Sequence, residues 1–311
     1  MAASKPPIPE IPSTMRIPNY LPPAPPKKDP KQPYLEVPTT THFYYAGIQS
    51  MWLWWVVDVK HLKHKVEEFG MTPYDFGGGK GLVNVNFFNA TAMYGAGQPG
   101  NPGEGGFNET ELNVVCHASA VSKLVPRQLS VEEFLENGEP TKRLGNMRLW
   151  VACDNEIAVV AGRTVFMENK FLTPYTYDVP NLNNPGHQGG PHTWTWTCHD
   201  PETNAPKDCI YAATVDLEGV SPTVSNMSEW IDLSWDEKSK RPVASRRNFY
   251  GMYHTFRLPR GSKAVSMSWG KSDHPMKKDM KKLIGRKKPI AVQTYVSPPV
   301  IAEWAGYYAD L

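Results

Sequence analysis

Hydrophobic and polar residues alternate along much of the chain, which is typical of β-strands that are buried on one face. The alternation is strictest in His192–His199, where Trp and Cys residues recur at every second position between Thr residues. Six further segments are rich in β-branched or aromatic residues and are also predicted as strands: 82–94, 109–119, 147–165, 210–215, 247–256 and 264–269. The pattern therefore predicts a mainly β protein.

Four segments carry helix signals and are predicted as peripheral helices: 58–69, 130–138, 273–285 and the residues from 297 onward. In the second segment, Ser130 and Glu133 have the spacing of a capping box. Gly residues stop the first three helices. In the last segment, Trp304, Tyr307 and Tyr308 are predicted to pack a helix against the sheet.

The N-terminal region differs in composition, because Pro occupies twelve of the first forty positions. Pro lacks a backbone N–H group and favours extended chain, so residues 1–40 are predicted to form an extended arm and residues 41–311 one domain. The arm is interpreted as a tether on this domain or on a neighbouring subunit, with a ligand for a Pro-recognition module as the alternative. No segment resembles a secretory signal or a membrane span, so a cytoplasmic protein is expected.

Charge and cysteine content exclude further classes of protein. A formal net charge of +2 gives no electrostatic basis for binding nucleic acid or a membrane. The four cysteines are expected to be free thiols, with a disulfide between Cys198 and Cys209 as the alternative because they flank a predicted hairpin. The His and Cys residues lack the compact spacing of a metal site, so neither a metal nor a cofactor is predicted. The segment Gly77–Gly81 lacks the spacing of a phosphate-binding loop and is interpreted as a turn before a strand.

Candidate chemistry is concentrated in the segment Asp154–Lys170. A β-branched run leads into Gly162-Arg163, and a lone Lys170 follows seven residues later among apolar and aromatic neighbours. Burial penalises a charged ammonium, so a poorly hydrated Lys loses its proton more easily. A neutral amine can attack a carbonyl and form a Schiff base, which then accepts electrons. Most Lys residues are solvated surface groups, so the spacing alone does not decide between the two interpretations.

This segment resembles the acetoacetate decarboxylase family, in which an acidic-Asn-Glu turn enters a strand ending in Gly-Arg-Glu, and an aromatic-Pro-Lys-Lys motif follows. Gly162 and Arg163 match, and Lys170 falls on the position of the Schiff-base lysine. The resemblance covers roughly residues 40–311. It implies an antiparallel, cone-like β-barrel with peripheral helices, and it implies a homo-oligomer.

The chain departs from the family motif around the lysine. Thr164 replaces the family Glu, Glu168 and Asn169 replace the aromatic-Pro pair, and Phe171 replaces the second Lys. A second ammonium therefore cannot lower the pKa of Lys170. Desolvation by Phe166, Met167 and Phe171 is expected to act in its place, whereas a nearby Glu168 carboxylate would favour the ammonium. The basic residue that the family carries near its first strand has no counterpart in residues 45–52, which weakens the case for a simple β-keto acid as substrate.

A second family position is a Glu that follows an aromatic residue on a strand. Phe107-Asn108-Glu109 fits this pattern, and Glu111 lies on the same strand face because side chains alternate with a period of two. The two carboxylates line a pocket in this interpretation. The alternative from the pattern alone is a solvated strand face.

Together these features predict a Lys-dependent lyase that forms a Schiff base with a small keto substrate. Lys170, Glu109 and Glu111 are the predicted catalytic residues, and the predicted supporting residues are Arg163, Phe107, Phe166, Glu168 and Phe171. Decarboxylation of a β-keto acid is the leading expectation. An aldolase–dehydratase or cyclase of the same fold, or a non-catalytic small-molecule-binding protein, are the alternatives.

Overall fold

A computed structural model describes residues 43–94, 104–126, 128–180, 192–203, 208–226, 229–248, 253–297, 300–303 and 306–310. The predicted Pro-rich arm of residues 1–40 lies outside these ranges. So do residues 95–103 and 181–191, the two longest gaps within the predicted domain. The prediction that residues 41–311 form a single domain stays a prediction.

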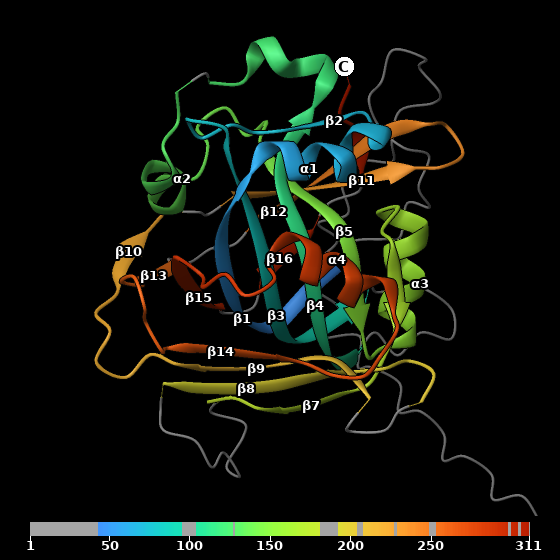
Figure 1. The fold of residues 1–311 in the computed structure, drawn as a ribbon. Coiled ribbons are helices and arrows are strands. Elements are labelled where there is room, and N and C mark those ends of the chain that lie inside the picture. Colours follow the sequence, from blue (N-terminus) through green and yellow to red (C-terminus); the bar gives the residue numbers. More distant parts are fainter. Residues whose placement is uncertain are drawn as a thin grey trace, which may run out of the picture.

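The centre of the molecule is one large β-sheet (Figure 1). Its longest strands pair antiparallel in the order β1 (Phe43–Asp58), β3 (Lys80–Tyr94), β4 (Glu104–Ala118) and β5 (Gly145–Cys153). The expectation of a mainly β protein is therefore confirmed.

Strand β5 also pairs in parallel with β6 (Lys170–Leu172) and with β11 (Glu229–Asp236), so the sheet is mixed and the purely antiparallel prediction was wrong. Strand β11 continues antiparallel to β12 (Arg241–Asn248). The remaining strands of this sheet are β2 (Met71–Pro73), β10 (Thr223–Ser225), β13 (Tyr253–Arg257), β15 (Ala291–Ser297), β16 (Val300–Glu303) and β17 (Tyr307–Tyr308). The strand order has two ends, β10 and β2, so a closed sheet is not established and the cone-like barrel stays a prediction.

A second sheet of four strands lies below the large one in Figure 1. Its order is β14 (Val265–Trp269), β9 (Cys209–Asp216), β8 (Thr193–His199) and β7 (Tyr175–Asp178). The ring of Trp196 on β8 stacks on Phe87 of the large sheet, with ring centroids 5.1 Å apart. The strictly alternating segment therefore forms the predicted half-buried strand, and the hairpin between Cys198 and Cys209 is present with both thiols free and buried.

Three of the four predicted helices are confirmed. Helix α1 (Val59–Val66) continues as a 3-10 turn that Gly70 ends, and α2 (Val131–Asn137) begins with the predicted capping box. Helix α4 (Pro275–Leu283) lies within the predicted segment 273–285. A further 3-10 segment spans Ser119–Leu124. No helix in the described parts of the chain is long and apolar enough to cross a membrane.

Two predictions at the level of secondary structure were wrong. The segment 147–165 is not one strand, because β5 ends at Cys153 and helix α3 (Glu156–Val165) follows. The Asn155 side chain accepts a hydrogen bond from the Ala158 N–H and caps this helix, so local capping and tertiary packing outweigh the strand preference of its Val and Ile residues.

The predicted C-terminal helix is replaced by strands β16 and β17. Strand β16 pairs with the first residues of β1, so its backbone groups find partners on an existing strand edge. The predicted strand 247–256 is also divided, between the end of β12 and the start of β13.

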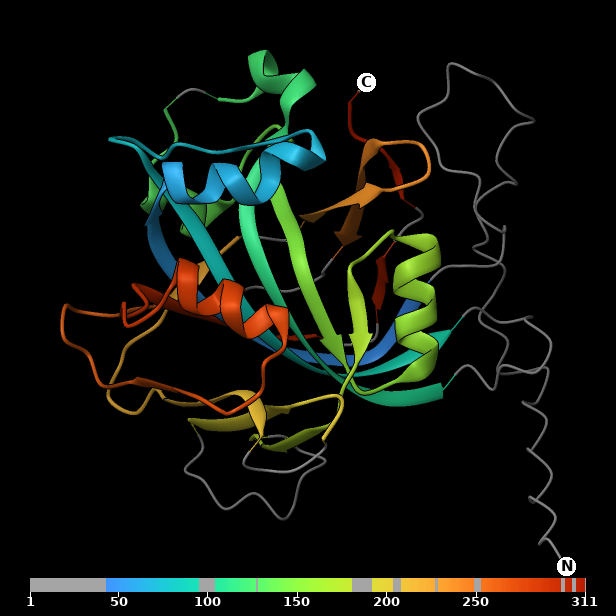
Figure 2. The same ribbon diagram turned by 45° about the vertical axis from the view of Figure 1, so that its right-hand side comes forward.

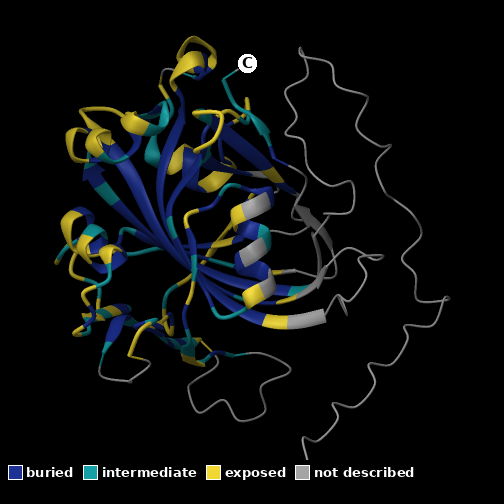
Figure 3. Cartoon of the chain, turned by 90° about the vertical axis from the view of Figure 1, so that its right-hand side faces the viewer, coloured by how far each residue is buried: buried dark blue, intermediate teal, exposed yellow. Residues whose placement is uncertain are grey.

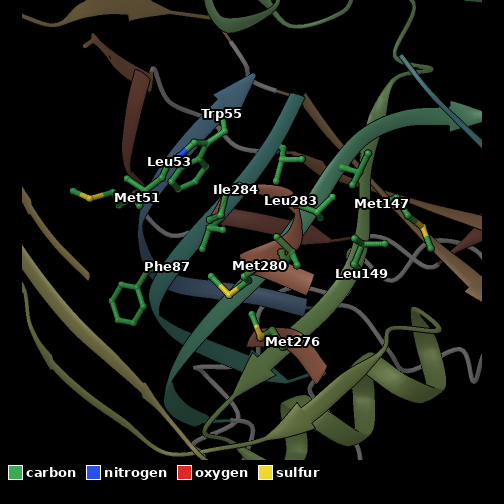
Figure 4. Close-up of a cluster of buried hydrophobic side chains, with 14 of the residues drawn as sticks. Met51, Leu53, Trp55, Phe87, Met147, Leu149, Met276, Met280, Leu283 and Ile284 are labelled. Carbon is green, nitrogen blue, oxygen red and sulfur yellow. The ribbon is translucent and has the colours of Figure 1, made fainter. Parts of the chain in front are cut away.

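The long strands of the large sheet consist mostly of buried residues (Figure 3), and these form two hydrophobic clusters. On one face, Met51 and Leu53 pack against Met276 and Met280 of α4 (Figure 4). On the other face, Trp52, Phe88 and Phe107 belong to a second buried cluster. Because side chains alternate along β4, Glu109 and Glu111 share the face of Phe107, and this face carries the candidate site.

Candidate active site

Lys170 and Glu109 form a buried ion pair on the large sheet. Lys170 is the first residue of β6, and β5 separates β6 from β4, which carries Glu109. The Lys170 Nζ lies 2.5 Å from Glu109 Oε2. The structure therefore brings two of the predicted catalytic residues into direct contact. Both are buried, with 7% of Lys170 and 3% of Glu109 exposed.

A second carboxylate contacts the same ammonium. Glu168 Oε2 lies 3.2 Å from Lys170 Nζ, and its other oxygen, Oε1, lies 2.6 Å from an Nη1 of Arg148 on β5. Glu168 therefore bridges the lysine and a guanidinium.

Helix α3 and the turn after it hold the lysine in place. The Gly162 carbonyl accepts hydrogen bonds from the Phe166 and Glu168 N–H groups, at 3.2 and 3.0 Å. Met167 has φ of +54°, a left-handed conformation that turns the chain from the helix into β6. Arg163 is exposed, and its Nε donates a hydrogen bond to the main-chain oxygen of Lys170 at 2.5 Å. Arg163 thus contacts the backbone of the lysine.

The ion pair is part of a larger buried network. Arg247 of β12 contacts Asp232 through Nε at 2.5 Å and Glu111 through Nη2 at 3.3 Å. Arg148 connects these residues to Glu168 and Lys170. Its Nη1 lies 3.5 Å from Asp232 Oδ2 and 3.9 Å from Glu111 Oε1. All four residues are 3% exposed or less. Glu111 therefore belongs to the same network as Lys170 but is paired with guanidinium groups.

Amide side chains satisfy the rest of Glu111. Its Oε2 accepts hydrogen bonds from Asn86 and Asn113, at 2.6 and 2.9 Å. Asn113 also donates to Asn84, which in turn donates to Asn146. A buried carboxylate with this many donors is held in one position, because displacing it would leave several buried polar groups unpaired.

The network shifts the pKa values of its acidic and basic groups. Burial raises the pKa of Glu109 to about 7, even though Lys170 acts in the opposite direction. Burial by itself would lower the pKa of Lys170, but the Glu109 and Glu168 carboxylates more than offset it and the pKa lies well above its usual value. The expected lowering of this pKa by desolvation is therefore wrong. The opposing effect of a nearby Glu168 was anticipated, but the contact of the ammonium with Glu109 was not. The pKa of Glu168 is lowered, because Arg148 and Lys170 together outweigh its burial.

The predicted aromatic residues occupy different places. Phe107 and Phe166 are buried in the cluster on the face of Glu109. The ring of Phe171 stacks on His274, with centroids 4.2 Å apart, and meets Trp150 edge-on. Because consecutive strand residues point to opposite faces, this ring lies on the α4 side of β6 and not beside the Lys170 side chain.

Sequence reasoning missed Arg148, Asp232 and Arg247. Two of them interrupt an apolar strand segment: Arg148 stands between Met147 and Leu149 in β5, and Asp232 between Ile231 and Leu233 in β11. A single charged residue at a position where the alternation requires burial was the available signal, since buried charges need partners.

Two further observations bear on ligands. Within the described ranges, no group of three or more His, Cys, Asp or Glu side chains is placed to hold a metal ion. A cavity of about 590 Å³ opens elsewhere, between β8 and the β13–β15 edge, and is lined in part by His192, Trp194, His254 and Phe256. It shares no lining residue with the Lys170 network, so the two are separate features.

Comparison with known proteins identifies the fold. No family model matches the sequence, and no curated protein matches it. Among solved structures, the enduracididine biosynthesis enzyme MppR complexed with pyruvate is 10% identical and covers 86% of this chain and 90% of its own, with a TM-score of 0.53. Acetoacetate decarboxylase from Legionella pneumophila is 11% identical over 92% of both chains, with a TM-score of 0.51. An acetoacetate decarboxylase-like enzyme from Sphingomonas wittichii RW1 is 13% identical over 86% of this chain and 92% of its own, with a TM-score of 0.50.

These likenesses define the class of protein to which the fold belongs. The chain has a mainly β, acetoacetate decarboxylase-like fold with a large mixed sheet. At 10–13% identity the likeness concerns the fold, and the chemistry of this chain has to be argued from its own residues.

Proposed function

We propose that this protein is a lysine-dependent carbon–carbon lyase in which Lys170 forms a Schiff base with a keto substrate. The observation that carries the proposal is the contact between Lys170 Nζ and Glu109 Oε2, at 2.5 Å, in a buried site where Glu109 has a pKa of about 7. A carboxylate whose pKa is near neutrality is suited to accept a proton and to return it. Glu109 therefore provides the route by which the ammonium of Lys170 becomes a neutral nucleophile.

The steps follow from this pair. Glu109 accepts a proton from the Lys170 ammonium, and the neutral Nζ attacks the substrate carbonyl carbon to form a carbinolamine. The carbinolamine oxygen leaves as water with a proton from Glu109, and the iminium remains on Lys170. A carbon–carbon bond next to the iminium then breaks, and its electron pair moves toward nitrogen to give an enamine. Protonation of the enamine carbon and attack by water release the product and restore the lysine.

Two outcomes share this enamine. Loss of carbon dioxide from a β-keto acid is the reaction that the sequence resemblance implies. The second candidate is the chemistry of an aldolase–dehydratase or a cyclase, and MppR has also been solved with the condensation product of pyruvate and imidazole 4-carboxaldehyde. That structure is a property of MppR, and it supports the second candidate here by similarity of fold.

A non-catalytic binding protein is the competing function, and one observation favours it. Glu109 and Glu168 raise the pKa of Lys170, which stabilises the ammonium instead of the nucleophile. In a binding protein the same network would serve only to neutralise buried charge.

Reductive trapping separates the enzyme from the binding protein. The protein is incubated with a panel of ketones and aldehydes plus cyanoborohydride, and adducts are mapped by intact-mass and peptide mass spectrometry. Wild type is expected to form one adduct on Lys170, and Lys170→Met none. Lys277→Met is the matched control, because Lys277 is also buried but donates to the Gly270 carbonyl and belongs to α4. No adduct on Lys170 with any carbonyl, or an unchanged adduct in Lys170→Met, would contradict the proposal.

The proposal extends to the assembly of the protein. The resemblance implies a closed, cone-like barrel and a homo-oligomer, and we retain both as proposals. Light scattering coupled to size-exclusion chromatography measures the mass of the assembly, and a monomer at micromolar concentration would contradict the proposed homo-oligomer.

A further inference from the structure

The ion pairs around Lys170 leave no excess of positive charge. Among the described residues, three cations meet four carboxylates in the network: Lys170, Arg148 and Arg247 against Glu109, Glu111, Glu168 and Asp232. With every group ionised, the network carries one negative charge. With Glu109 protonated, it is neutral. Proton transfer between Lys170 and Glu109 leaves this sum unchanged.

Both guanidinium groups of the network already hold protein carboxylates. Arg148 contacts Glu168 at 2.6 Å and Arg247 contacts Asp232 at 2.5 Å, and the two share Glu111. A substrate carboxylate could bind either guanidinium only by displacing a buried carboxylate, which would then lose its own counter-charge. Arg163 of helix α3 is a third basic side chain near Lys170. It is exposed, and its Nε donates a hydrogen bond to the Lys170 main-chain oxygen.

We propose that the substrate is a neutral carbonyl compound, a hydroxyketone or hydroxyaldehyde without an ionised carboxylate beside the reacting carbonyl, and that its bond is cleaved in the retro-aldol sense. This inference rests on the proposed Schiff-base function and selects between its two outcomes. An extra anion in a buried site that is neutral or negative is strongly disfavoured, because desolvation is not repaid by a cation.

Retro-aldol cleavage is compatible with the protein's own groups. After iminium formation Glu109 is a carboxylate again, and it accepts the proton of the substrate hydroxyl. The bond between the hydroxyl-bearing carbon and the carbon next to the iminium breaks, which releases an aldehyde or ketone and leaves the enamine. Glu109 then gives the proton to the enamine carbon, and water hydrolyses the resulting iminium. Neither a cofactor nor an external redox partner enters this sequence.

Acetoacetate and its methyl ester test the inference, because they share the same reacting ketone, whereas the carboxyl group is ionised in one and methylated and neutral in the other. Each is incubated at equal concentration with the full-length protein and cyanoborohydride, and the rate of Lys170 modification is measured by mass. The ester is expected to modify Lys170 at least about tenfold faster, the order expected for one like charge in a partly buried site. An unsubstituted N-isopropyl group on Lys170, in place of the carboxylate-bearing adduct, would report that acetoacetate is decarboxylated on the enzyme.

The outcomes distinguish the inference from the function on which it rests. Faster modification by the ester supports the inference. Equal or faster modification by acetoacetate, or the isopropyl adduct, overturns the neutral-substrate inference while supporting the Schiff-base function. No adduct on Lys170 with either probe or with the carbonyl panel overturns both.

A charge variant tests the cause. Glu111→Gln removes one negative charge near Arg148 and Arg247 and keeps the shape of the side chain, so it is expected to reduce the preference for the ester several-fold. Glu136→Gln is the matched control, because Glu136 is partly exposed and pairs with Arg257 at the surface. If Glu111→Gln does not fold, Asp232→Asn removes a charge from the same two guanidinium groups. An unchanged preference in a folded variant of either kind would contradict the inference.

Discussion

Gly162 and Lys170 are packed so closely that a Cβ atom added to Gly162 would lie 2.5 Å from the Cδ of Lys170. The same atom would overlap Glu168 Oε2. We therefore expect Gly162→Ala to displace the lysine, to destabilise the protein by about 1–3 kcal/mol, and to slow reductive trapping at least about tenfold. Urea unfolding and the trapping rate measure the two effects.

The control for this variant is Gly47→Ala, because an added Cβ on Gly47 would have no atom within 4 Å. It makes the same chemical change on a strand where space is open. If Gly162→Ala is trapped at the wild-type rate, the turn tolerates the methyl group and the close approach has no role in placing Lys170.

Arg148 is the residue on which the charge balance depends most, since it contacts three carboxylates: Glu168, Asp232 and Glu111. Replacing it leaves buried negative charges without a partner. Arg148→Met is expected to lower the free energy of unfolding by about 3–5 kcal/mol. The matched variant Arg257→Met removes a partly exposed pair with Glu136 and is expected to cost less than about 1 kcal/mol. Similar losses in the two variants would show that burial of the network contributes little.

The rate of Schiff-base formation is expected to depend on the ionisation of Glu109. Because Glu109 must be a carboxylate to accept the proton of Lys170, and its pKa is raised to about 7, trapping should speed up as the pH rises through about 7. Glu109→Gln is expected to trap slowly and to lose this pH dependence. The trapping rate between pH 5 and pH 9 measures both, and an unchanged profile in the variant would assign the titration to another group.

The same carboxyl group is expected to affect stability in the opposite direction. Its pKa is about 7 in the folded protein and near 4.5 in the unfolded chain, so the folded state binds more protons between these values. The resulting stabilisation is complete below pH 4.5 and is lost as the pH rises through 7, by up to about 3 kcal/mol. Urea unfolding of wild type and Glu109→Gln at several pH values gives the difference. The free energy of unfolding of wild type minus that of the variant is expected to fall as the pH rises through 7. A rise with pH would contradict the raised pKa of Glu109.

Phe171 stands where the acetoacetate decarboxylase motif has a second Lys, but its ring packs on His274 on the α4 side. A Lys side chain at this position would point the same way, because strand residues alternate. Phe171→Lys is therefore expected to destabilise the protein and to leave the pH dependence of trapping unchanged. A fall of one pH unit or more in the trapping profile would show that the second ammonium reaches Lys170.

Local signals predicted the elements that are determined locally. The capping box at Ser130 and Glu133 appears in the structure, since it depends on residues only three positions apart. Helix α3 was mistaken for strand, because its Val and Ile residues favour strands and the Asn155 cap was overlooked. The final strands were mistaken for a helix, because β16 pairs with β1, more than 250 positions away, and β17 pairs with β12.

The candidate site was predictable to a similar extent. Lys170, Glu109 and Glu168 follow from a motif and from strand alternation, and they lie in one cluster. The raised pKa of Lys170 did not follow, because it depends on carboxylates placed by the fold of β4 and of the α3 turn. The guanidinium of Arg247 reaches Glu111 from 136 residues further along the chain, and no local pattern specifies that contact.

That long separation has a consequence for the growing chain. Lys170 and Glu168 are two residues apart, so their contact can form as soon as the α3 turn forms. Glu111 must wait for Arg247, which a ribosome adds 136 residues later. Until Arg247 is present, burial of the Glu111 carboxylate is unfavourable, so we expect the strands around it to remain accessible to water. Completion of the buried network can therefore begin only after β12 has been synthesised.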